Sequence, residues 1–127
     1  MKLIFVGIIF SVVFGLIGAE LIDTHSIEVS GLIECCDHLN KCEPPKKAKI
    51  ELWDYYKFFP NVLLYPLEIE NSRRYSFKWT DGKVFDVKPL LKVHIQCSDG
   101  TIFDQTYDSF SNTKQISQDI KVQMQLL

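Results

Sequence analysis

Four cysteines constrain this chain more than any other feature, and three of them fall within the nine residues ECCDHLNKC, from Glu34 to Cys42. The fourth, Cys97, lies far along the chain. A cluster of this kind can form a metal site, a redox site or a pair of disulfides. The compartment that the chain reaches decides among these, because paired cysteines persist as disulfides only under oxidising conditions.

The first residues indicate that compartment. After Met1-Lys2 the chain runs from Leu3 to Gly18 without a charge, and Ala19 precedes the first acidic residue. A positive start, a short apolar core and a small residue at its end are typical of a secretory signal peptide. The sixteen-residue apolar run is shorter than the roughly 20 residues that cross a bilayer. We therefore predict a signal peptide over residues 1–19 and a secreted domain over residues 20–127.

The mature chain has the size and charge of one extracellular domain. Removal of residues 1–19 leaves 108 of the 127 residues, with 13 basic and 16 acidic side chains and a net charge of −3. A length of this order fits a single domain. No second apolar span follows, and no basic stripe is present for nucleic acid. We expect a soluble product that does not span a membrane and has no nucleic-acid partner.

Apolar and polar residues alternate along the mature chain with the period of a β-strand. The pattern is clear in segments 27–35, 48–52, 75–79, 91–97 and 120–126, and weaker in 63–69 and 101–107. Asp81-Gly82 and Asp99-Gly100 follow two of these segments as turn signals. About seven short strands without a helical period predict an all-β antiparallel sandwich. The polar stretch from Asp108 to Gln118 is expected to be a mobile loop.

The alternation also places the cysteines. Cys35 and Cys97 each end the apolar face of a strand, so both side chains should point into the core, where a disulfide can join two sheets. Of the three ways to pair four cysteines, a bond between the neighbours Cys35 and Cys36 closes the most strained ring. We therefore predict the disulfides Cys35–Cys97 and Cys36–Cys42.

A metal site and a redox site are the alternatives for the cysteine cluster. Cys36, His38 and Cys42, with Asp37 as a fourth ligand, are residue types that zinc accepts. Zinc requires reduced thiols, however, and an oxidising compartment favours disulfides. A redox site typically has Cys-x-x-Cys beside a helix start, a pattern that the sequence lacks. We expect no metal and no cofactor.

Three segments, in this order, resemble the nematode transthyretin-like family of small secreted proteins. They are VSGLIEC from Val29 to Cys35, AKIELWD from Ala48 to Asp54 and DVKPLLKVHIQC from Asp86 to Cys97. The resemblance covers most of the mature chain, from about Val29 to the final strand. It implies a transthyretin-like, or prealbumin-like, β-sandwich in which Cys35 is bonded to Cys97.

The third segment departs from the family pattern. Leu90 stands where the family usually has Tyr, Ile95 stands where it has His, and His94 comes one residue earlier, on the opposite face. The distant relatives of the family include transthyretin, a hormone carrier, and a hydrolase of 5-hydroxyisourate with active-site histidines and a Tyr-Arg-Gly-Ser end. This chain ends in QMQLL, so the resemblance does not extend the hydrolase activity to it.

Catalytic residues do not form a recognisable pattern in this sequence. His25, His38 and His94 stand in separate segments, and the carboxylates and serines show no catalytic spacing. We therefore expect that the protein is not an enzyme. The basic pairs Lys46-Lys47 and Arg73-Arg74 are typical of solvated sheet edges, although they also suit an anionic head group or receptor.

The stretch WDYYKFFPNVLLYP, from Trp53 to Pro66, is the strongest indication of function. Its six aromatic residues surround the turn signal Pro60-Asn61. In one interpretation, the commoner case, the rings are buried as a satellite cluster over one end of the sandwich. In the other they form an exposed patch that binds a partner. The candidate binding residues are then Trp53, Tyr55, Tyr56, Phe58 and Phe59.

Two functions are consistent with these features. The leading one is a secreted, non-catalytic protein that binds an extracellular partner, either a cell-surface receptor or an anionic membrane surface. The alternative is a carrier of a small apolar ligand, held in the sandwich or between paired subunits. Lys121, Gln123 and Gln125 face outward in the last segment, and so polar a face counts against an apolar groove there.

Overall fold

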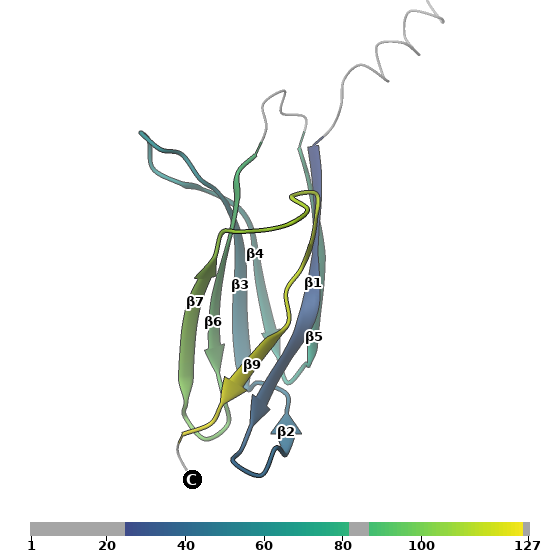
Figure 1. Cartoon of the computed structure of the whole chain (residues 1–127), viewed down its shortest axis with the longest axis vertical. Coiled ribbons are helices and arrows are strands. Elements are labelled where there is room, and N and C mark those ends of the chain that lie inside the picture. Colours follow the sequence, from purple (N-terminus) through teal and green to yellow (C-terminus); the bar gives the residue numbers. More distant parts are fainter. Residues whose placement is uncertain (1–24, 82–86, 126–127) are drawn as a thin grey trace, which may run out of the picture.

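The computed structural model describes residues 25–81 and 87–125, and every regular element within them is a β-strand. The strands are β1 (His25–Cys36), β2 (Cys42–Glu43), β3 (Lys47–Asp54), β4 (Val62–Glu70), β5 (Arg74–Asp81), β6 (Pro89–Gln96), β7 (Ile102–Tyr107), β8 (Gln115–Ser117) and β9 (Ile120–Gln123). They form two sheets (Figure 1). The predicted all-β sandwich is confirmed, whereas the predicted signal peptide and Gly82 of one predicted turn lie outside the described residues. Within those residues no helix is long and apolar enough to cross a membrane.

The two sheets differ in their pairing. One sheet has the strand order β4-β3-β6-β7, and each neighbouring pair in it is antiparallel. The other is built around β1, which pairs antiparallel with β5 and β2 but parallel with β8 and β9. The prediction of antiparallel pairing is therefore wrong for β8 and β9. After β7 the chain crosses to the other sheet and then runs in the same direction as β1 (Figure 1).

The sequence pattern locates seven of the strands and misses two short ones. Each of the seven alternating segments corresponds to a strand, although β9 ends at Gln123, earlier than the pattern indicated. Residues 115–117, which we expected in a mobile loop, form β8 beside β1. The amide of Gln118 donates to the Ser30 carbonyl at 3.0 Å, just after these residues. A strand this short, with Ile116 as its only buried residue, gives no readable period.

The core lies between the inner faces of the two sheets, which contribute alternate residues as the period-2 pattern requires. The first sheet supplies Ala48, Ile50, Leu52, Leu91, Val93 and Ile95, and the second supplies Ile27, Val29, Ile33, Tyr75, Phe77, Trp79, Ile116, Ile120 and Val122. Tyr65 of β4 extends this core, because its ring stacks on Phe77 with 4.5 Å between centroids. The burial of these side chains against one another therefore holds the two sheets together.

Both predicted disulfides are present. Cys35 on β1 is bonded to Cys97, the residue after β6, with both side chains buried in the core and 2.03 Å between the sulfurs. Cys36 is bonded to Cys42 on β2, with 2.06 Å between the sulfurs. The first bond links the two sheets, and the second closes the loop between β1 and β2, which we call the stapled loop (residues 37–41).

At Gly31 the chain that follows β8 comes very close to β1. A Cβ atom placed on Gly31 would lie 1.9 Å from the Gln118 carbonyl oxygen and 2.8 Å from the Tyr75 hydroxyl oxygen. That hydroxyl donates a hydrogen bond to the same carbonyl at 2.5 Å, and burial raises the pKa of Tyr75 well above its usual value. The glycine of the VSGLIEC segment is therefore required by packing.

We predict that Gly31→Ala destabilises the fold by about 2 to 3 kcal/mol, because the added methyl group must displace backbone and break the Tyr75 hydrogen bond. Urea unfolding of the secreted protein measures this loss. Ser30→Ala is the matched control, since Ser30 is exposed on the same strand. A Gly31→Ala protein as stable as the Ser30→Ala protein would contradict the packing role of Gly31.

We also predict that the two disulfides contribute unequally to stability. The cysteines of the long bridge are 62 residues apart and those of the short bridge are 6 apart. Loop-closure entropy then gives about 4 kcal/mol for the first and about 2 kcal/mol for the second. The double variant Cys35→Ala/Cys97→Ala should therefore unfold at lower urea than Cys36→Ala/Cys42→Ala. Equal midpoints would show that the bridge between the sheets has no special role.

Candidate interaction surface

The chain between β3 and β4, residues 55–61, is held at its base by three hydrogen bonds. The buried carboxylate of Asp54 accepts from the Lys88 amide at 3.1 Å. The Tyr55 amide donates to the Lys88 carbonyl at 2.9 Å. The Tyr56 amide donates to the side-chain oxygen of Asn61 at 3.1 Å. The first two bonds tie the end of β3 and the start of the loop to the chain before β6, and the third closes the loop across its own base.

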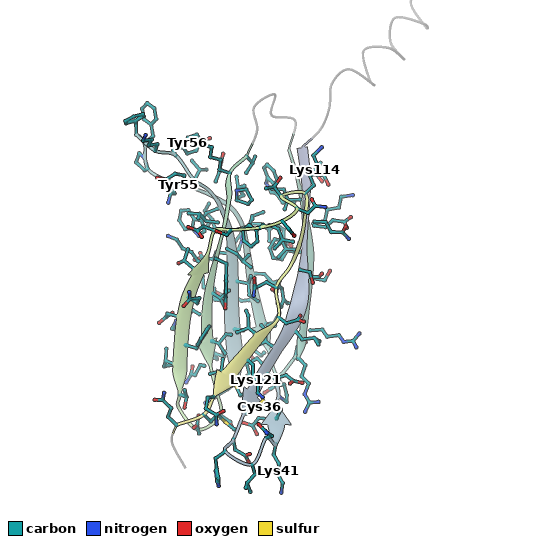
Figure 2. All side chains as sticks on the ribbon, in the orientation of Figure 1. Cys36, Lys41, Tyr55, Tyr56, Lys114 and Lys121 are labelled. Carbon is teal, nitrogen blue, oxygen red and sulfur yellow. A yellow bond between two sulfur atoms is a disulfide. The ribbon has the colours of Figure 1, made fainter. Side chains whose placement is uncertain are left out.

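Beyond this base the loop projects past the end of the β4-β3-β6-β7 sheet and away from β1 (Figure 1). Four of its aromatic rings are exposed, with Phe58 at 83%, Phe59 at 72%, Tyr55 at 42% and Tyr56 at 36%. Figure 2 shows Tyr55 and Tyr56 on this projection, away from the core. We call these four residues the aromatic tip. The interpretation that their rings are buried against the sandwich is therefore wrong, because the projecting backbone carries them beyond the core.

Trp53 does not belong to the aromatic tip. It lies on β3, on the outward face of its sheet opposite Leu90, and it is half-buried. The Lys92 ammonium group lies 4.4 Å from the centre of its indole, which is the geometry of a cation–π contact. Of the five predicted binding residues, the structure thus groups four and leaves Trp53 on the sheet below them.

The sequence-based prediction missed two further members of this apolar surface. Val62 and Leu63 are 43% and 40% exposed at the start of β4. A bulge in the β3–β4 pairing places Leu63 opposite Trp53 and leaves Leu64 as the extra residue. Without knowledge of the bulge the facing of these residues cannot be read from alternation. The sequence did contain one signal for a longer apolar surface, namely the scarcity of charge: Lys57 is the only charged residue in the stretch 55–67.

The stapled loop has the features of a structural element. The Cys36–Cys42 bond occupies both sulfurs, so they are not thiolate ligands for a metal, although a carboxylate oxygen of Glu34 lies within 4.8 Å of each. The Asp37 carboxylate accepts from the amides of Leu39 at 2.8 Å and Lys41 at 2.9 Å. The hydrogen bond from Lys41 is the main cause that lowers the pKa of Asp37. This loop is at the end opposite the aromatic tip (Figure 1).

Charged side chains cover the outward face of the β4-β3-β6-β7 sheet. His94 and Asp104 form an exposed pair through Nδ1 and Oδ1, and Lys49 lies 3.8 Å from Glu51. Water screens such exposed pairs, so they contribute little to stability. His38, in the stapled loop, is also exposed and is not part of this face. The expectation that the protein is not an enzyme stays a prediction.

The basic pairs lie apart from the aromatic tip. Lys46-Lys47 precede or begin β3, whereas the tip follows the end of that strand. Arg73 lies in the turn between β4 and β5 and donates to the Cys42 carbonyl at 2.8 Å. A partner surface that contacts the tip end-on cannot also contact these cations. The sequence left open whether the aromatic and the basic residues form one binding surface, and the structure places them apart.

An open groove of about 570 Å³ lies beside the base of the loop. Its lining combines apolar and polar side chains: Tyr55, Asn61, Val87, Lys88, Pro89, Leu90, Asp108 and Thr113. Its volume falls in the range of small-molecule sites. Tyr55 belongs to both the groove and the tip, so the two features adjoin.

Comparisons with known proteins place the chain in no established family. No protein-family model matches the sequence, and no curated protein matches it significantly. One solved structure is similar in shape, a 9R-lipoxygenase from Cyanothece PCC8801, with a TM-score of 0.44 and 16% sequence identity. The alignment covers 79% of this chain but only 16% of the lipoxygenase. A likeness this weak carries no argument about function.

We predict that the aromatic tip contributes nothing to folding stability. Phe58→Ser/Phe59→Ser should change the free energy of unfolding by less than about 0.5 kcal/mol, as is usual for exposed residues. Tyr65→Ala should cost about 3 kcal/mol, because Tyr65 packs against Phe77. Thermal and urea unfolding distinguish the two. A large loss in the Phe58→Ser/Phe59→Ser protein would mean that the rings pack on the sandwich after all.

Proposed function

We propose that this chain is a secreted, non-catalytic binding protein that docks through its aromatic tip onto a partner surface outside the cell. The observation that carries the proposal is the exposure of Phe58 and Phe59, at 83% and 72%, on a projection with a fixed base. Contiguous exposed apolar surface is unfavourable in water and commonly marks an interaction site. Aromatic residues also dominate the energetics of interfaces.

Two disulfides support the secreted location, because such bonds persist in oxidising compartments. We further propose membership of the transthyretin-like family. The β-sandwich and the Cys35–Cys97 bond are what that resemblance implies, and they support it. A non-catalytic role is favoured because His38 and His94 are exposed on separate elements and do not share a site.

Binding of the labelled, secreted protein to intact cells tests the proposed function. We expect saturable binding that falls at least about tenfold in the Phe58→Ser/Phe59→Ser variant, since interface anchors of this kind commonly contribute 2 kcal/mol or more. Leu39→Ser is the matched control, because Leu39 is a 65% exposed apolar residue in the stapled loop. Binding that both variants retain in full, or no binding at all, would contradict the proposal.

Transport of a small apolar ligand is the second candidate, and the groove beside Tyr55 is the feature that favours it. The exposed, polar Lys121 and Gln123 of β9 offer no such site on their own face. Titration with apolar fluorescent probes distinguishes the two functions. Saturable, stoichiometric binding that Leu90→Lys abolishes and Phe58→Ser leaves unchanged would favour the carrier.

A further inference from the structure

We infer that the partner of the aromatic tip is the surface of a phospholipid bilayer, into which Phe58 and Phe59 insert. This inference rests on the proposed function, since it names the class of partner that the tip binds. Three features of the loop support it: the order of its rings, its charge, and the scarcity of polar side chains at its outer end.

The order of the rings along the loop matches the polarity gradient of a membrane interface. Phe58 and Phe59, which have no polar atoms, are the most exposed rings, and Tyr55 and Tyr56 lie nearer the base of the loop with lower exposure. Phenylalanine favours the hydrocarbon side of the interface, whereas the amphipathic tyrosine ring favours the level of the head groups. The two phenylalanine rings lie at the outer end of the projection, where they are the first rings to reach such a surface.

Charge in the loop is complementary to phospholipid phosphates. Lys57 is the only charged residue between Asp54 and Glu68, and Asp54 is buried. The Lys57 ammonium group lies 5.5 Å from the centre of the Phe58 ring. Insertion of that ring therefore brings a cation to the level of the phosphates, while no exposed carboxylate of this stretch opposes it.

Polar side chains that could recognise a protein are scarce at the outer end of the loop. Protein interfaces carry about one hydrogen bond per 100–200 Å², and they depend on side chains that can donate or accept. The Asn61 side-chain oxygen is already bonded to the Tyr56 amide, and from Lys57 to Pro60 the only polar side chain is that of Lys57. A bilayer requires no such specific partners, so it is the surface that this loop fits best.

The insertion is shallow. Residues 57–60 belong to no strand, and backbone amides and carbonyls without partners are unfavourable in hydrocarbon. The rings of Phe58 and Phe59 therefore enter the acyl region while the loop backbone stays at the level of the hydrated head groups. Interfacial segments bind membranes at this depth.

Co-sedimentation of the secreted protein with phosphatidylcholine vesicles, with and without phosphatidylserine, measures the affinity. We expect binding to both, with a decrease of about tenfold or more in Phe58→Ser/Phe59→Ser and no change in Leu39→Ser. Lys57→Gln should weaken binding about fivefold only where phosphatidylserine is present. Equal affinity of the original and Phe58→Ser/Phe59→Ser proteins would overturn the inference.

A tryptophan at the tip reports insertion directly. In Phe58→Trp, lipids brominated on the acyl chains should quench the added fluorescence, whereas in Leu39→Trp, at the stapled end, they should not. Quenching of neither variant overturns the inference even if the protein sediments with vesicles. If vesicle binding fails but cell binding remains dependent on Phe58 and Phe59, the partner is a cell-surface molecule other than the lipid, and only this inference falls. If both fail, the proposed function falls as well.

Discussion

The Cys35–Cys97 disulfide joins β1 to the end of β6, inside the core, and this covalent link between the sheets determines how the rest of the molecule is held. Because β6 pairs with β3 along eight residues, the bridge connects β1 to the pair of strands that leads to the tip. The base of the aromatic tip is in turn bonded to Lys88, just before β6. A loop tied at its base in this way would lose less conformational entropy on docking than an unattached one.

The approach of the chain at Gly31 is the second constraint on the sandwich. The chain after β8 lies so close to β1 that its Gln118 carbonyl reaches the Tyr75 hydroxyl on β5, the strand on the other edge of β1. This single bond therefore spans three neighbouring strands. The close approach itself depends on side-chain size, because a residue larger than glycine at position 31 would push the two segments apart.

Alternation predicted most of the fold because one face of each long strand is buried and the other is solvated. It placed Cys35 and Cys97 in the core and His94 outside, which made the disulfide pairing accessible from sequence. It failed for β8, where a single buried residue leaves no period, and for the parallel pairing with β1, which depends on a crossover that local pattern does not encode. Alternation also failed at the candidate site, because the extra residue of the bulge near Leu64 reverses which side chains face outward. The exposure of the tip could not be predicted for another reason. The same aromatic residues are equally suited to a buried cluster, and the direction in which the hairpin projects determines whether they are exposed.

Distance from the tip determines which charged side chains could interact with a partner bound there. The eight residues of β3 extend for about 26 Å at the usual rise of a strand, and this length separates Lys46-Lys47 from the tip. Electrostatic interactions between exposed charges are screened over about 8 Å at physiological ionic strength. The basic pair and Arg73 would therefore contribute almost nothing to tip-first binding, whereas Lys57 is the cation that the tip itself carries. In the proposed function, docking would therefore depend chiefly on apolar burial, and the stapled end, with its exposed charges, would face away from the partner.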